Sequence, residues 1–173
     1  VELAGSDIPR DKLDFIYRLK TGALLEASML IGAVLGGAAE EDCKIVERLA
    51  SHIGMAFQIQ DDILDYTPTA HTGKPANNDL REGKITLPLL SVLDRASESR
   101  RKELLERLAR CHENDEDVEY LRSTVENEGG LAFAAEVMQG YIARAVEMLA
   151  DYPDSEYRSA LVNLCAYIAE RDR

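Results

Sequence analysis

A helical spacing of apolar residues runs through almost the whole chain and limits the fold more than any other feature. From Asp11 to Leu35, and again in the stretch before Tyr66, apolar side chains recur every three or four positions, as in an amphipathic α-helix. The same spacing returns in the second half, and no stretch has the two-residue alternation of a strand. The sequence therefore predicts an all-α helical bundle, with the 173 residues forming one domain or part of one.

Turn residues divide this pattern into separate helices. We expect a buried central helix over Asp11 to about Leu35, and a second helix from about Cys43 to Tyr66. The stretch from Thr67 to Asn78 is rich in Pro, Thr, Gly and Asn and predicts an active-site loop. A third helix should begin at Asp79, with Pro88 kinking it or shifting its start. Further helices are expected over residues 97–111, 118–126, 131–149 and 155–168.

Composition excludes several classes of function. The 20 basic and 32 acidic residues give a net charge of −12, which argues against a nucleic-acid partner, because phosphate backbones attract basic surfaces. The longest apolar run, around Met29 to Ala39, is broken by glycines and too short to cross a bilayer, so we expect no stable membrane insertion. The three cysteines are odd in number and widely spaced, which favours free thiols and a cytoplasmic protein.

Three aspartates lie close together at the end of the second predicted helix. At helical spacing Asp61 and Asp65 share one face, and Asp62 lies about 100° further around the helix. Carboxylates at this end face the negative pole of the helix dipole, which is unfavourable by ~0.3–1 kcal/mol each. A hard divalent cation such as Mg²⁺ would reverse that sign. From these residues alone, a magnesium site and an acidic helix end exposed to solvent both remain open.

Basic residues follow shortly after the aspartates. Lys74, Arg81 and Lys84 return positive charge to this part of the sequence. Acids that hold a metal, next to bases that hold a phosphate, are typical of a metal-bridged polyphosphate site. The alternative is that these side chains form weak surface ion pairs with the aspartates. Further upstream, Lys20 lies in an apolar helix, where it either binds an anion or extends to the helix edge.

Taken together, these motifs resemble the second aspartate-rich region of the trans-isoprenyl diphosphate synthases, the polyprenyl synthetase family. The matching segments are Phe57-Gln58-x-x-Asp61-Asp62-x-x-Asp65, Gly73-Lys74-Pro75, Asp79-Leu80-Arg81-Glu82-Gly83-Lys84-x-Thr86-Leu87-Pro88, an upstream Lys20-Thr21 pair, and Gly129-Gly130 before an alanine-rich helix. The resemblance implies the isoprenoid synthase fold. It covers nearly the whole chain but only the C-terminal part of the family, since a first aspartate-rich motif and a Gly-Lys-x-x-Arg-Pro segment are not found in this sequence.

The resemblance also implies a reaction and roles for particular residues. The reaction is the condensation of an allylic diphosphate with isopentenyl diphosphate to give a longer trans-polyprenyl diphosphate. The implied Mg²⁺ ligands are Asp61, Asp62 and Asp65. The implied diphosphate-binding residues are Lys20, Lys74 and Lys84. The implied catalytic residues are Lys20, Thr21 and Gln58, with the oxygen dipoles of the last two facing the developing cation. Asp79 would orient Lys74 or a metal-bound water.

As a C-terminal part, the chain is expected to be inactive alone. Half a bundle leaves apolar helix faces uncovered, which predicts a homo-oligomer or association with the missing N-terminal half. Two other readings remain. The chain could be a non-catalytic regulatory subunit or helical interaction module of the same fold, or a terpene cyclase, which shares metal-bound aspartates and diphosphate ionisation.

Overall fold

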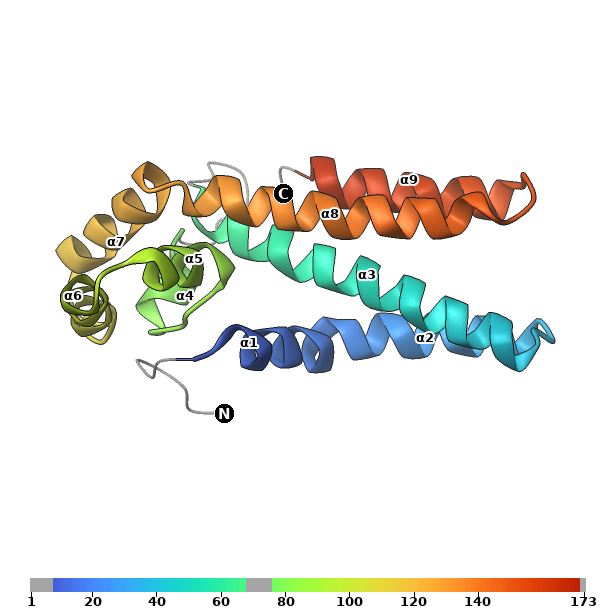
Figure 1. Cartoon of the computed structure of the whole chain (residues 1–173), viewed down its shortest axis with the longest axis horizontal. Helices are drawn as coiled ribbons and strands as arrows, with labels where there is room; N and C mark the ends of the chain where they lie inside the picture. The colour runs from blue at the N-terminus through green and yellow to red at the C-terminus, as the bar shows by residue number, and fades with distance from the viewer. Residues whose placement is uncertain (1–7, 68–75, 172–173) are drawn as a thin grey trace. The chain divides into compact units, whose positions relative to one another are not determined.

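The structure is a computed structural model that describes residues 8–67 and 76–171. All regular secondary structure in these two ranges is helical, which confirms the predicted all-α class. The helices, in chain order (Figure 1), are α1 (Arg10–Tyr17), the π-helical turn η1 (Arg18–Gly22), α2 (Ala23–Leu35), α3 (Glu40–Asp65), α4 (Asn78–Arg81), α5 (Leu87–Arg95), α6 (Glu98–Leu108), α7 (Asp115–Asn127), α8 (Gly130–Ala150) and α9 (Glu156–Glu170).

The described residues divide into two compact units. The first contains residues 8–13, 61–67 and 76–135, and the second contains residues 14–60 and 136–171. The three cysteines of the chain carry no disulfide bridge. Within the described ranges, no helix has both the length and the apolar character needed to cross a membrane.

The core of the first unit is built by α5, α6 and α7, each of which contacts the other two. The side chains that are almost completely enclosed there are Leu80, Leu87, Leu89, Leu90, Leu93, Leu104, Leu108, Leu121 and Val125. The single helix expected from Asp79 onward is instead two helices, α4 and α5. Gly83 interrupts it with a left-handed backbone (φ 67°), and Thr86 is extended. Pro88 lies in the first turn of α5, where its missing N–H removes no helical hydrogen bond.

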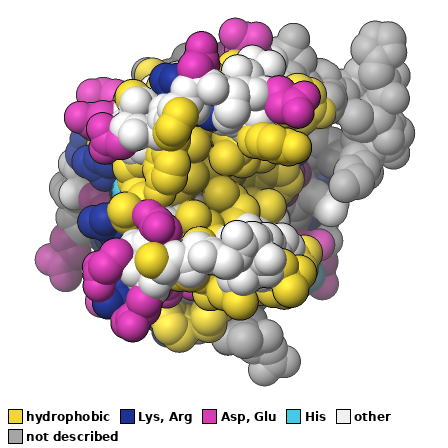
Figure 2. Space-filling model, turned by 90° about the vertical axis from the view of Figure 1, so that its right-hand side faces the viewer, with side chains coloured by type: hydrophobic (Ala, Val, Ile, Leu, Met, Phe, Trp, Pro, Cys, Tyr) yellow, Lys and Arg dark blue, Asp and Glu magenta, His cyan; other side chains and the backbone are white. Residues whose placement is uncertain are grey.

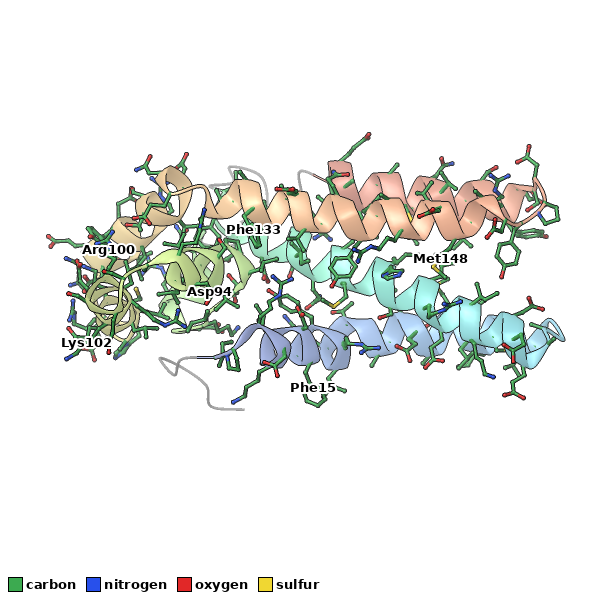
Figure 3. The ribbon with its side chains drawn as sticks, viewed as in Figure 1. Phe15, Asp94, Arg100, Lys102, Phe133 and Met148 are labelled. Atoms are coloured by element: carbon green, nitrogen blue, oxygen red, sulfur yellow. The ribbon has the colours of Figure 1, made fainter. Side chains whose placement is uncertain are left out.

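A buried ionic cluster joins α6 to α7 in the first unit. The carboxylate of Asp117 is only 3% exposed and accepts hydrogen bonds from Arg107 Nη1 (2.6 Å) and Arg110 Nε (2.8 Å). Hydrogen bonds from Arg110 and then Arg107 hold the pKa of this carboxyl below its usual value. The guanidinium of Arg107 also lies 3.8 Å from the centre of the Tyr120 ring. Arg100, labelled in Figure 3, reaches Glu103 Oε2 at 3.0 Å.

In the second unit, α3, α8 and α9 supply most of the buried side chains. Figure 1 shows α8 and α9 running in opposite directions from the turn that joins them. The rings of His52 on α3 and Tyr141 on α8 lie 5.8 Å apart. The buried apolar residues of this unit include Leu49, Ile53, Met55, Ile59, Met138, Ile142, Leu149, Cys165 and Ile168.

The most apolar helix of the second unit, α2, differs from expectation. A buried central helix was predicted here, but α2 contains no buried residue. Leu24, Ile31, Val34 and Leu35 expose between 59% and 83% of their surface. Figure 2 views the molecule from the right-hand side of Figure 1 and shows hydrophobic side chains gathered into a patch, with acidic and basic side chains at its edge. Within the described residues, no other segment removes these apolar side chains of α2 from water.

Candidate functional site

The three predicted metal ligands lie in the last turns of α3, which ends at Asp65. Asp61 is exposed, Asp62 is buried, and Asp65 is half-buried. Two of the three therefore face protein as well as solvent, which a purely solvated acidic helix end does not explain.

Asp65 closes the loop that follows α3. Its carboxylate oxygens accept hydrogen bonds from the backbone N–H groups of Asn78 (3.0 Å) and Asp79 (2.9 Å). Its own carbonyl accepts the N–H of Asn77 at 2.7 Å. Asn77 has a left-handed backbone (φ 63°), which turns the chain into α4. One residue thus fastens the start of the loop to its end.

Asp62 makes a similar connection to α5. Its Oδ2 atom lies 3.4 Å from the backbone nitrogen of Leu87, the first residue of that helix. The N–H groups of a first helical turn have no partner inside the helix, so a carboxylate there satisfies a donor and complements the dipole. The positions of α4 and α5 are therefore both tied to the carboxylates of α3.

Two buried hydroxyl groups near these carboxylates escaped the sequence analysis. The hydroxyl oxygens of Tyr66 and Thr86 are fully enclosed and lie close to each other. Burial raises the pKa of Tyr66, the neighbouring Thr86 hydroxyl opposes this rise, and the negative charges of Asp62 and Asp65 add to it. In the sequence, Thr86 was noticed only as part of the motif before Leu87 and Pro88, and nothing in that motif indicated that its hydroxyl is buried.

Negative charge accumulates around Asp65. Burial raises the pKa of this carboxyl, and the charges of Asp79 and Asp61 add to that effect, while the backbone N–H groups of Asp79 and Asn78 oppose it. An added cation would relieve the same repulsion.

Lys84 and Arg81, two basic residues that follow the aspartates, already have acidic partners. Lys84 Nζ lies 3.2 Å from Asp79 Oδ1 and also pairs with Glu82. These partners, Glu82 foremost, raise the pKa of Lys84. Arg81 reaches Asp115 at the start of α7, at 2.5 Å. Asp79 therefore contacts Lys84 here, whereas Lys74, its predicted partner, lies outside the described residues.

The carboxylates fit a hard divalent cation that is only partly held by protein. Among the described residues, no three His, Cys, Asp or Glu side chains form a ready-made metal cage. Mg²⁺ does not need one, since it is commonly bound by one or two carboxylates and completed by waters and substrate phosphates. Asp61 is exposed, and each Asp65 oxygen that accepts one hydrogen bond keeps a further lone pair.

The other predicted residues belong to the second unit. Lys20 and Thr21 lie in η1, where the backbone of Lys20 (φ −75°, ψ −105°) departs from helical values and breaks the predicted continuous helix. Lys20 is exposed rather than enclosed, and Thr21 is half-buried. Gln58 lies on α3 and is only 3% exposed.

The sequence analysis also missed the contact of Arg171 with α3. The Arg171 guanidinium lies 4.6 Å from the centre of the Phe57 ring, and the Arg171 carbonyl accepts a hydrogen bond from Gln60 Nε2 at 2.8 Å. No local pattern could have revealed it, because the residues are 111 positions apart.

A small pocket in the first unit is separate from all predicted site residues. It has a volume of about 200 Å³ and is lined by Leu90, Arg95 and Phe133, among others. Asp94, labelled with Phe133 in Figure 3, also lines it.

Comparison with known proteins gives a consistent result. The family model described as polyprenyl synthetase matches residues 4–125. The chain is 38% identical, over 166 residues, to geranylfarnesyl diphosphate synthase of Aeropyrum pernix, covering 93% of this chain and 51% of that protein. It is 34% identical, over 163 residues, to the short chain isoprenyl diphosphate synthase of Methanothermobacter thermautotrophicus, covering 92% of this chain and 49% of that protein.

Solved structures extend the comparison to the fold. The polyprenyl synthase from Caulobacter crescentus CB15, solved with calcium and isoprenyl diphosphate, has a TM-score of 0.87 and is 31% identical. That alignment covers 99% of this chain and 53% of the other. The chain thus spans about half the length of the relatives it matches.

Proposed function

Because the chain belongs to the polyprenyl synthetase family, we propose that the full-length protein is a trans-prenyltransferase that joins an allylic diphosphate to isopentenyl diphosphate and releases a longer trans-polyprenyl diphosphate. The names of its relatives, which include geranylfarnesyl and short chain isoprenyl diphosphate synthases, support this substrate class. A solved relative was complexed with isoprenyl diphosphate.

The observation that carries the proposal is the carboxylate group at the end of α3. Asp62 and Asp65 are held by backbone N–H groups of α4 and α5, and Asp61 is exposed beside them on the same helix. Side chains fixed in this way are preorganised, so binding a cation and a diphosphate requires little further ordering.

The proposed metal is Mg²⁺, with Asp61, Asp62 and Asp65 as its protein ligands, directly or through water. When bound, the metal would neutralise charge on the diphosphate as its bond to the allylic carbon breaks. The calcium in the solved relative supports an oxygen-ligand site of this kind.

The proposed diphosphate ligands are Lys20, Lys74 and Lys84. For Lys84 this means exchanging Asp79 and Glu82 for phosphate oxygens, so Asp79 would hold the lysine until substrate arrives. The oxygen atoms of Thr21 and Gln58 would face the allylic cation, which the double bond of isopentenyl diphosphate then attacks before losing a proton. Gln58 suits this role because its side chain is already removed from water.

We further propose that the 173-residue chain alone lacks turnover and associates with itself or with the N-terminal half that the family resemblance implies. The exposed apolar side chains of α2 support such an association. The unbridged cysteines support a reducing compartment such as the cytoplasm.

The proposal is tested by incorporation of labelled isopentenyl diphosphate into product by the full-length protein, with and without Mg²⁺. We expect Asp61→Ala to lower turnover at least about 100-fold, because the metal stabilises the charge that develops on the diphosphate. The matched control is Asp154→Ala, which removes an aspartate that is 93% exposed, lies just before α9 and pairs with Arg158 in the first turn of that helix.

Unchanged turnover in Asp61→Ala would show that this aspartate has no metal role. A wild-type protein that binds diphosphate and Mg²⁺ but makes no product would favour the regulatory subunit instead. Cyclic products formed without uptake of isopentenyl diphosphate would favour a terpene cyclase.

A further inference from the structure

The π-helical turn η1 touches α3 backbone to backbone, through Gly22 and Gly54. A Cβ atom built on Gly54 would lie 2.9 Å from the Cα atom of Gly22, and 3.8 Å and 3.9 Å from its nitrogen and carbonyl carbon. A separation below 3.0 Å is closer than real Cβ contacts, and the opposing atom is backbone, so it has no rotamer by which to move away. Any side chain at position 54 must therefore displace η1 or α3.

Gly22 is restricted from its own side as well. A Cβ atom on Gly22 would lie 3.1 Å from the carbonyl oxygen of Tyr17, one π-helical turn earlier. The backbone of Gly22 is ordinary helix (φ −54°, ψ −47°), so a side chain at this position is restricted by space and not by backbone conformation.

The contact lies next to three residues with proposed roles. Gly22 directly follows Lys20 and Thr21, where the helical path is broken. Gly54 lies one turn before Gln58 on α3, so the two share a face of that helix. π-helical turns inside α-helices are frequent at functional sites, and this one lies so close to α3 that a side chain at position 54 has no room.

We propose that the Gly22–Gly54 contact is a positioning device, which sets the place of Lys20 and Thr21 against the turn of α3 that carries Gln58. This inference rests on the proposed function, which assigns diphosphate binding to Lys20 and stabilisation of the cation to Thr21 and Gln58. Neither glycine has a side chain that could touch substrate, so both act through their neighbours.

Simple close packing makes a different prediction from positioning. If the contact only stabilised the fold, adding a methyl group would lower stability, and each molecule that remained folded would bind diphosphate normally. If the contact positions Lys20, the folded variant binds diphosphate more weakly, because the lysine no longer lies where it meets the anion. Catalysis also falls, since a misplacement of about 1 Å is enough to reduce it by about 100-fold.

The test uses Gly54→Ala in the full-length protein, with Gly140→Ala as its control. Gly140 is also a helical glycine of the second unit, but a Cβ atom there meets nothing within 4 Å. Three quantities are measured: the thermal unfolding midpoint, the Mg²⁺-dependent binding of inorganic diphosphate by calorimetry, and kcat and KM for condensation. We expect Gly54→Ala to unfold cooperatively, with diphosphate affinity about 10-fold lower and kcat about 10- to 100-fold lower. Gly140→Ala should leave affinity and kcat unchanged.

A double-mutant cycle identifies the residue through which Gly54 acts. Lys20→Ala alone should weaken diphosphate binding about 10-fold or more, since it removes a direct charge from the anion. In a protein that already carries Gly54→Ala, Lys20→Ala should weaken diphosphate binding by less than about threefold, because the displaced lysine has already lost its contact with the anion. Where Gly54→Ala does not fold, Gly22→Ala replaces it: its Cβ atom meets the Tyr17 carbonyl oxygen at 3.1 Å, so it disturbs η1 itself rather than α3, and the same loss of diphosphate affinity is expected.

The outcomes separate this inference from the function on which it rests. The positioning role is overturned if Gly54→Ala folds and keeps wild-type diphosphate affinity and kcat. It is also overturned if the losses in affinity from Gly54→Ala and Lys20→Ala are independent, so that the double variant loses the product of the two. Either result leaves the function of Lys20 intact. Unchanged diphosphate binding in Lys20→Ala itself would overturn the proposed role of that lysine, and the positioning role with it. Non-additive losses in affinity, with Gly140→Ala unaffected, support the proposal.

Discussion

At the scale of single residues, Asp117 is the most buried carboxylate among the described residues. It is almost completely buried and held by Arg107 and Arg110. Replacing it with Asn leaves Arg110 without this charged partner and leaves Arg107 with Glu103. We expect Asp117→Asn to lower the free energy of unfolding by roughly 2 kcal/mol, less than for a fully enclosed pair, because solvent reaches Arg110. Urea unfolding at pH 7 measures the difference.

The same residue predicts a pH dependence. Its pKa in the folded state is depressed, first by Arg110 and then by Arg107, below the value of about 3.9 expected in the unfolded chain. The carboxylate therefore stabilises the fold above about pH 4, and this contribution is lost as pH falls through the folded-state pKa. The stability difference between wild type and Asp117→Asn should shrink below about pH 4.

A control for this pH dependence is Glu119→Gln. Glu119 pairs with Arg122 at 2.6 Å, but its side chain is 62% exposed, so little change in stability is expected at either pH. A difference for Asp117→Asn that stayed constant from pH 7 to pH 3 would contradict the assignment.

The sequence identified the aspartates of the candidate site but not the backbone hydrogen bonds that two of them accept. Asp61, Asp62 and Asp65 were recognisable from their spacing and their place at a helix end. The hydrogen bonds that Asp65 and Asp62 accept come from residues 13 to 25 positions away, and no local pattern encodes such contacts. Their roles as metal ligands, and those of Lys20, Lys74 and Lys84, remain predictions.

At the scale of whole helices, α8 offers a matched pair of glycines. A Cβ atom on Gly130 would lie 2.5 Å from the carbonyl oxygen of Pro88, whereas one on Gly140 would meet nothing within 4 Å. Gly130→Ala should therefore destabilise the protein by about 1–3 kcal/mol through overpacking. Gly140→Ala should stabilise it by about 0.5–1 kcal/mol, because alanine is the better helix former.

Thermal unfolding of the two variants side by side checks this difference in sign. Because both substitutions add the same methyl group to the same helix, helix propensity alone would raise both midpoints. A higher unfolding midpoint for Gly130→Ala than for wild type would show that α5 can move away from α8 without loss of stability.

The sequence predicted most helices closely, since apolar spacing and turn residues are local signals. The helix expected over residues 131–149 is α8 (Gly130–Ala150), and the one expected over 155–168 is α9 (Glu156–Glu170). The split between α4 and α5 had a local cause in Gly83 that the apolar pattern concealed. The break at Lys20 had no such signal, and the part of α3 that lies against η1 is more than 30 positions away in the sequence.

At the scale of the whole molecule, the exposed apolar surface of α2 should control association. Ile31 and Leu35 lie one turn apart and are 59% and 83% exposed. We expect the isolated 173-residue chain to self-associate and to bind a hydrophobic dye, because exposed apolar surface of this kind is removed from water by contact. The double variant Ile31→Glu and Leu35→Glu should reduce both effects without loss of helical circular dichroism.

Sedimentation over a range of protein concentrations measures the association, with the Ile31→Glu and Leu35→Glu double variant as the comparison. A concentration-independent monomer for the unmodified 173-residue chain would show that α2 is stable in water and needs no partner.

The hydrogen bonds around Asp65 have a consequence for how this position can change in evolution. Since Asp65 binds the backbone of residues 77–79, it anchors the start of α4 beside the carboxylates of α3. A substitution that removes this carboxylate therefore removes the anchor together with a predicted metal ligand. Because both roles depend on one side chain, a variant protein cannot lose one of them and keep the other.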